Sequence, residues 1–153
     1  MPTPNQDYPA KKAVHVIVTN FDEKPEIMKK ALMAVNATSV TVNMGNKNHP
    51  FGSKKTLLQA LEANGYIKAF ANAGVKAVYF DKCMNVGFPQ SPMAYRNLEM
   101  ITVHSNYSLA VSIDDNREYY NQRVKEVNAE LKSFGKCIFN LTAPIEQLSM
   151  KLT

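Results

Sequence analysis

The sequence predicts a single α/β domain with three layers and a mixed, partly parallel sheet. Its 153 residues are about the length of one domain. The composition, 45% hydrophobic and 20% charged, is enough to build a core and excludes intrinsic disorder. Residues 12–80 follow the order strand, helix, strand, helix, strand. Connections of this length make the three strands parallel, with right-handed crossovers.

The N-terminal part begins with a polar stretch, residues 1–11, which contains three prolines and predicts a flexible lead-in. The domain is therefore expected to cover residues 12–153. Residues 12–21 are almost continuously apolar and β-branched, which predicts a central strand covered on both faces. Asp22 is expected to cap the next helix, with Pro25 in its first turn. That helix carries one broad apolar stripe: Ile27, Met28, Ala31, Leu32 and Val35.

The middle of the chain contains two further strands, predicted over residues 38–44 and 75–80. Between them lie a loop rich in turn-forming residues and a helix that Ser53 is expected to cap. A short second helical piece covers residues 66–72. The segment from residue 81 to 97 has no periodicity and is longer than the usual connection of about 4–6 residues, a property typical of functional loops.

The C-terminal part predicts strands over residues 98–106 and 107–113, with a hairpin that would add antiparallel strands to the sheet. The clearest helix follows, and Gly135 ends it before a last strand over residues 136–141. Because residues 107–141 form a complete βαβ pattern, a ferredoxin-like α+β arrangement is the alternative fold. The helix has an apolar stripe with spacings of four, three and four: Tyr120, Val124, Val127 and Leu131.

Several classes of protein do not fit this sequence. No apolar run approaches the ~20 residues that cross a bilayer, and the N-terminus lacks the pattern of a secretory signal. The two cysteines, Cys83 and Cys137, are too few for a disulfide scaffold and suit a reducing compartment. We therefore expect a cytoplasmic protein that does not enter a membrane.

The positive charge is concentrated in the first half of the chain. The formal net charge is +5, and residues 47–76 contain five lysines and a single acidic residue, Glu62. Such an excess favours anionic partners: a phosphate, a nucleotide or a nucleic acid. A solvated lysine surface that serves solubility is the alternative. The chain has only three arginines, which weakens the case for nucleic acid, because arginine makes the bidentate contacts to phosphate and guanine.

Polar side chains follow the ends of the predicted strands, where open α/β sheets bind their ligands. A strand order of 2-1-3 would place Asn20 between Asn43 and Asp81. The alternative is that these are ordinary turn residues. The candidate ligand-binding residues at this edge are Asn20, Asn43, Asn46 and His49.

His104 and Asp81 are the best acid–base pair that the sequence offers. An imidazole titrates near neutrality, and a carboxylate can fix its tautomer and orientation. His15, inside the first strand, is interpreted as a satisfied core residue. The histidines and cysteines lack the spacings of metal ligands, so no metal site is expected, and no motif implies a cofactor.

The loop after the second strand resembles a phosphate-binding loop only in its position. Six residues separate its glycines, and a serine precedes the lysines, so nucleoside-triphosphate hydrolysis is rejected. A weaker hypothesis remains, in which Ser53, Lys54 and Lys55 form an anion site at the start of the helix. The alternative is an ordinary serine-capped helix. Cys83 is a lone cysteine, and such residues are usually inert.

Three hypotheses of function follow, and the sequence does not decide whether the protein is an enzyme. The first is a small enzyme that acts on an anionic, nucleotide- or phosphate-bearing metabolite by general acid–base chemistry. The second is a non-catalytic protein that binds or sequesters such a ligand, with a homo-oligomer compatible with this role. The third, ranked last, is a basic RNA- or DNA-binding module.

Overall fold

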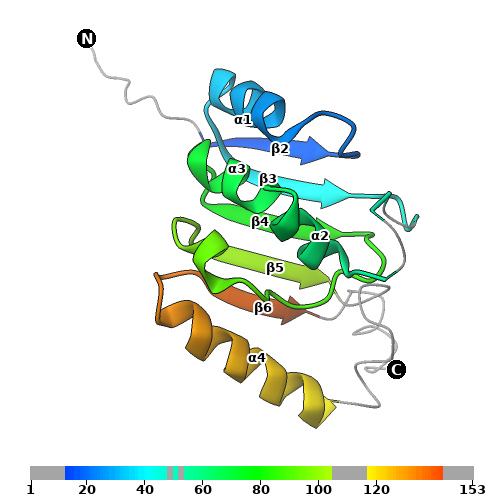
Figure 1. The fold of residues 1–153 in the computed structure, drawn as a ribbon, viewed down its shortest axis with the longest axis vertical. Helices are drawn as coiled ribbons and strands as arrows, with labels where there is room; N and C mark the ends of the chain where they lie inside the picture. Colours follow the sequence, from blue (N-terminus) through cyan, green and yellow to red (C-terminus); the bar gives the residue numbers. More distant parts are fainter. Residues whose placement is uncertain (1–12, 48–49, 52–53, 105–116, 143–153) are drawn as a thin grey trace.

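Five parallel strands form one sheet, and their order in the sheet is their order in the chain (Figure 1). The computed structural model describes residues 13–47, 50–51, 54–104 and 117–142. The predicted single-domain α/β class is confirmed. From one edge of the sheet to the other, the strands are β2 (Val14–Val18), β3 (Ala37–Asn43), β4 (Ala77–Asp81), β5 (Met100–His104) and β6 (Ile138–Thr142).

Among the strands that the structure describes, the first one lies at an edge of the sheet and not at the predicted central position. β2 pairs with β3 alone among the described strands, and not with β4. Its apolar run hides an alternation: Val18 is buried, whereas His15 and Ile17 are exposed on the other face. β-branched residues suit a strand wherever it lies in a sheet, so composition alone did not reveal the edge.

β5 is parallel to both of its neighbours, which corrects the expected antiparallel addition to the sheet. Met100 pairs in parallel register with Ala77 on β4 and with Ile138 on β6. This pairing also excludes the ferredoxin-like alternative. The physical reason is that residues 82–99 form a complete crossover, which returns the chain from the carboxyl end of β4 to the end of the sheet where β4 begins. This crossover includes the short 3₁₀ helix η1 (Pro92–Tyr95). The predicted turn at 105–106 and the strand at 107–113 lie outside the described residues.

The described helices form one layer on one face of the sheet (Figure 1). Right-handed crossovers that always step to the next strand place every connection on the same side. The described elements therefore form two layers, whereas the sequence predicts three. The layer runs from α1 through α3 to η1 and α4, each in contact with the next, and α2 packs on α3. Its helices are α1 (Pro25–Ala34), α2 (Leu57–Ala63), α3 (Tyr66–Asn72) and α4 (Arg117–Lys132).

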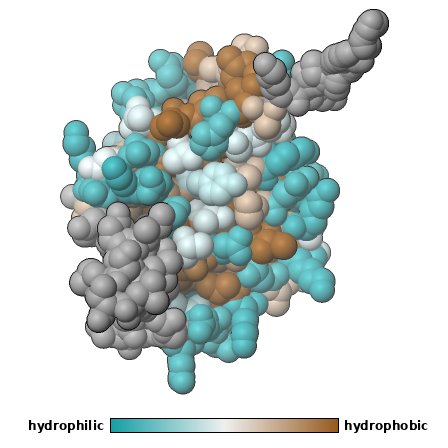
Figure 2. Space-filling view, turned by 180° about the vertical axis from the view of Figure 1, so that it is seen from behind, coloured by the Kyte–Doolittle hydropathy of each residue, from teal (hydrophilic) through white to brown (hydrophobic). Residues whose placement is uncertain are grey.

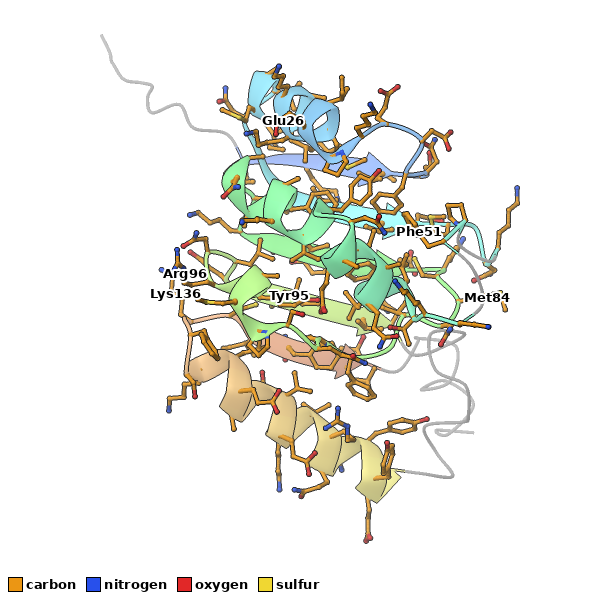
Figure 3. All side chains as sticks on the ribbon, viewed as in Figure 1. Glu26, Phe51, Met84, Tyr95, Arg96 and Lys136 are labelled. Carbon is orange, nitrogen blue, oxygen red and sulfur yellow. The ribbon has the colours of Figure 1, made fainter. Side chains whose placement is uncertain are left out.

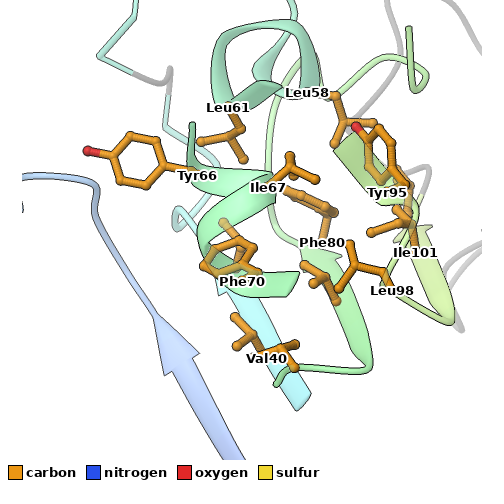
Figure 4. Close-up of a cluster of buried hydrophobic side chains, with 14 of the residues drawn as sticks. Val40, Leu58, Leu61, Tyr66, Ile67, Phe70, Phe80, Tyr95, Leu98 and Ile101 are labelled. Atoms are coloured by element: carbon orange, nitrogen blue, oxygen red, sulfur yellow. The ribbon is translucent and has the colours of Figure 1, made fainter. Parts of the chain in front are cut away.

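The core lies between this helical layer and the sheet. Figure 4 shows Val40, Phe80 and Ile101 of the sheet facing Ile67 and Phe70 of α3. All five side chains are fully buried, and burial of such a side chain stabilises the fold by roughly 1.5–3 kcal/mol. The stripe predicted on the last helix is confirmed: Tyr120, Val127 and Leu131 are buried, and Val124 packs against the core.

The opposite face of the sheet carries two rows of five side chains that contain no Asp, Glu, Lys or Arg. Figure 2 views the molecule from this side, where weakly polar residues gather at the centre among apolar ones. No helix in the described ranges is long and apolar enough to span a bilayer. In register, the first row is His15, Ser39, Ala77, Met100 and Ile138, and the second row is Ile17, Thr41, Tyr79, Thr102 and Asn140.

Candidate active site at the carboxyl edge of the sheet

The strand register brings Asn43, Asp81 and His104 to adjacent positions at the carboxyl edge of the sheet. Asn43 pairs with Asp81, and Asp81 and His104 each follow the last pair of the β4–β5 ladder, Phe80 with Val103. Neighbouring strands lie about 4.8 Å apart. Because side chains alternate along a strand, all three residues lie on the face opposite to the helices. All three are half-buried.

Asn20 lies at the same edge of the sheet but does not stand between Asn43 and Asp81. Val18, at the end of β2, pairs with Val42 of β3. Asn20 comes two residues later and therefore lies on the side of β3 that faces away from β4. The expected position was wrong because it assumed that β2 separates β3 from β4. The Oδ1 atom of Asn20 accepts a hydrogen bond from the Asp22 N–H at 3.1 Å and so shapes the turn before α1.

The loops after β3 and β4 are joined to each other and contain strained backbone. The Asn46 N–H donates to the Lys82 carbonyl at 2.7 Å, and Asn43 Oδ1 accepts from the Gly45 N–H at 2.9 Å. Asn46, Lys82 and Asn85 have positive φ angles of 61°, 51° and 52°. A left-handed conformation costs an ordinary residue roughly 1–2 kcal/mol, and such strain clusters at functional sites.

The lysines of residues 47–76 do not form one surface. Lys47 and Lys54 are exposed at the carboxyl edge, where the exposed Lys82 joins them. Lys76 directly precedes β4, at the opposite edge of the sheet. Figure 3 helps to distinguish the two edges: Phe51 and Met84 lie near the strand arrowheads, whereas Arg96 and Lys136 lie at the opposite edge. The positive charge at the carboxyl edge is therefore a local feature.

The helix that follows these lysines begins later than predicted. Thr56, and not Ser53, caps α2: the Thr56 Oγ1 atom accepts from the Gln59 N–H at 3.2 Å, and the Gln59 Oε1 atom accepts from the Thr56 N–H at 3.0 Å. The N–H groups of Leu57 and Leu58 donate to the carbonyls of Asn85 and Val86.

These contacts change the expected anion site. The N–H groups at the start of α2 are already bonded within the protein, so they offer no anion cradle. Lys54 and Lys55 remain exposed in front of the cap. His49 and Ser53 lie outside the described residues.

A shallow hollow of about 280 Å³ lies between α2 and the loop after β4, and Glu62 is among the residues that line it. The Glu62 carboxylate accepts from the N–H groups of Gln90 and Ser91 and from the Tyr95 hydroxyl. Glu62 therefore anchors the long loop. Burial raises the pKa of Tyr95 well above its usual value, and the nearby Glu62 adds to the shift. In the sequence, Glu62 is recognisable as the one acidic residue among the five lysines of residues 47–76.

The two cysteines are unsuited to nucleophilic chemistry. Burial raises the pKa of Cys83 to about 11 and that of Cys137 to about 12. The Cys83 thiol also donates to the Val42 carbonyl at 3.2 Å. A thiol reacts as its thiolate, and the thiolate is scarce at neutral pH in both residues.

His15 is exposed, so its interpretation as a core residue was wrong. Its two ring nitrogens lie within hydrogen-bonding distance of the Ser39 and Thr41 hydroxyls, at 2.6 and 2.7 Å. Sequence reasoning missed this cluster because the contact joins two strands. The available signal was the alternation of polar and apolar residues along β3.

In the described part of the chain, no three His, Cys, Asp or Glu residues are grouped so that they could hold a metal ion. Comparison with models of protein families, with curated proteins and with solved structures finds no match.

Proposed function

We propose that the protein binds an anionic, phosphate- or nucleotide-bearing small molecule at the carboxyl edge of the sheet and acts on it by general acid–base chemistry. The observation that supports this proposal is the register row of Asn43, Asp81 and His104 on three consecutive strands. Ligands of open α/β sheets bind at this edge. The carboxylate of Asp81 and the imidazole of His104, on adjacent strands, are groups that commonly transfer protons in general acid–base catalysis.

Each residue has a definite role in this proposal. His104 transfers the proton, and Asp81 orients its ring and stabilises the imidazolium form. The amide groups of Asn43 and Asn46 hydrogen-bond to the ligand, where charge develops. The exposed ammonium groups of Lys47, Lys54, Lys55 and Lys82 attract the anion.

A thermal-shift screen with product analysis tests the proposal. Nucleotides, sugar phosphates and short RNA are each added at low and at high salt. A ligand at a hundredfold excess over its dissociation constant stabilises the folded protein by roughly 2.7 kcal/mol. We expect a small phosphorylated molecule to give a shift that persists in salt. An RNA-only shift that disappears in salt would contradict the proposal.

Variants then separate binding from catalysis. Lys54→Gln combined with Lys82→Gln is expected to weaken binding, whereas Lys68→Gln combined with Lys76→Gln, with the same change in net charge, is not. His104→Gln is expected to lower turnover on the order of 10²-fold or more and to leave binding within a few-fold. Binding without any product in the wild-type protein would reduce the function to sequestration.

A further inference from the structure

Three side chains on the open face of the sheet form a hydroxyl–imidazole–hydroxyl cluster. His15 comes from β2, and Ser39 and Thr41 come from β3, two residues apart on the same face. The ring lies between the two hydroxyls, with Nδ1 at 2.6 Å from Ser39 Oγ and Nε2 at 2.7 Å from Thr41 Oγ1. His15 is exposed and both hydroxyl residues are half-buried, so a solute can approach the cluster.

The number of donor hydrogens in the cluster requires the two hydroxyls to play different hydrogen-bonding roles. A neutral imidazole has one N–H donor and one bare nitrogen that accepts. One hydroxyl must therefore donate its proton to the ring, while the other accepts from the ring N–H. The donating hydroxyl faces a general base that a third group orients, which is the arrangement of an activated nucleophile.

The surroundings favour Ser39 as that hydroxyl. Its register neighbour on β4 is Ala77, whose side chain is a single methyl group. The neighbour of Thr41 is Tyr79, whose ring lies 6.2 Å from the His15 ring, between centroids. The hydroxyl of Thr41 is also secondary and more hindered than the primary hydroxyl of Ser39. Thr41 is therefore better placed to accept from Nε2–H and to hold the ring.

We propose that Ser39 is a nucleophile that accepts an acyl group from small activated carboxylic esters, with His15 as its general base and Thr41 as a positioning residue. Ser39 Oγ forms a bond to the carbonyl carbon while its proton moves to His15 Nδ1. The bond from that carbon to the leaving oxygen then breaks, and the leaving group takes the proton from Nδ1. The products are the acyl-serine and an alcohol or phenol, with no oxidant or reductant required.

This site is separate from the carboxyl edge. Ser39 precedes Asn43 by four residues on β3, a distance of about 13 Å along a strand. The acyl-transfer proposal does not depend on the function proposed for His104 and Asp81.

Labelling with p-nitrophenyl acetate, followed by peptide mass spectrometry, tests the proposal. Ser133 is the internal control, because it is exposed and its hydroxyl donates to the backbone carbonyl of Ala129 and not to an imidazole. General-base assistance is typically worth 10²–10⁴-fold, so we expect Ser39 to be acetylated on the order of 10²-fold faster than Ser133. Equal rates at the two serines would overturn the proposal.

Variants assign the roles within the cluster. His15→Gln is expected to reduce Ser39 acetylation to within about threefold of the Ser133 rate, if the whole general-base effect is lost. Thr41→Val, which keeps the shape but removes the hydroxyl, is expected to slow the reaction, and Thr41→Ser to restore it. Each variant is checked for an unchanged thermal unfolding midpoint. Acetylation that persists in His15→Gln, or that moves to Thr41, would contradict the assignment.

Discussion

Burial determines the chemistry of the two cysteines. In the folded protein, Cys83 is 1% exposed and Cys137 is 4% exposed. Their pKa values rise because the charged thiolate loses solvation in the core. The neutral thiol is therefore favoured in the fold. The raised pKa also makes the free energy of unfolding depend on pH, because the unfolded chain loses the same proton at lower pH.

The stability of the protein is expected to fall as the pH rises from 9 to 11. Below pH 9 both states carry the Cys83 thiol, whose ordinary pKa is 9.0, so its contribution is complete. Above pH 9 the unfolded chain ionises while the folded protein holds its proton until about pH 11, and the contribution is lost. For two pH units this loss is at most about 3 kcal/mol.

Urea unfolding of the wild-type protein and of Cys83→Ala at pH 8, 9 and 10.5 measures this contribution. The variant also loses packing, but that loss does not depend on pH and cancels in the slope. Tyr66, Tyr95 and Cys137 have raised pKa values as well and give both proteins the same background decline. We expect the shallower slope in Cys83→Ala, and parallel slopes would refute the assignment.

At the scale of the element, the start of α2 is held by a contact between two segments. Thr56 caps the helix, and its side chain lies against Gly87, which has a φ angle of +78°. A Cβ atom added at Gly87 would lie 2.6 Å from Thr56 Cβ, closer than two such atoms can approach. The helix cap and the loop after β4 therefore depend on each other.

Substitutions at these two positions should differ in cost. Thr56→Ala removes the cap and is expected to lower the free energy of unfolding by about 1 kcal/mol, with Thr56→Ser as the nearly neutral control. Gly87→Ala is expected to cost about 2 kcal/mol, because it adds a left-handed alanine to the displaced cap. Urea denaturation measures each value. An unaffected Gly87→Ala protein would show that the loop does not pack on Thr56.

Helix α2 also shows what the sequence could have revealed. Thr56 and Gln59 have the spacing of a capping box, in which the two side chains and two backbone N–H groups bond reciprocally. Serine is a good cap by itself, which favours Ser53, but Ser53 lacks a glutamine or glutamate three residues later. The stripe of α4 was predictable, since its helical period and its buried face coincide.

Strand order could not be predicted in the same way. Every parallel strand ends at the same edge, so the position of Asn43 and Asp81 at this edge followed from the predicted parallel pattern. His104 lies there because β5 is parallel to β4, whereas the sequence predicts an antiparallel strand at this point. The position of Asn20 depended on which strands pair, and pairing is determined by contacts between residues far apart in the chain. The same limit concealed the cluster of His15 with Ser39 and Thr41.

At the scale of the molecule, the two faces of the sheet differ in composition and burial. All-parallel sheets are usually covered on both faces, and their strands are then continuously apolar. Here Val40, Val78 and Ile101 point into the core and are fully buried, whereas Ile17 and Ile138 are 62% and 54% exposed. The strands alternate as they do in a sheet with one solvated face.

The same substitution on the two faces should therefore have very different costs. Ile101→Ala removes buried methyl groups and is expected to lower the free energy of unfolding by about 2–5 kcal/mol. Ile17→Ala is expected to change it by less than about 1 kcal/mol, because the side chain is already in contact with water. Urea denaturation of both variants gives the comparison, and Ile101→Val, with an expected cost of about 0.5–1.5 kcal/mol, replaces Ile101→Ala if that protein does not fold. Equal losses from the two alanine variants would mean that the second face is covered in solution.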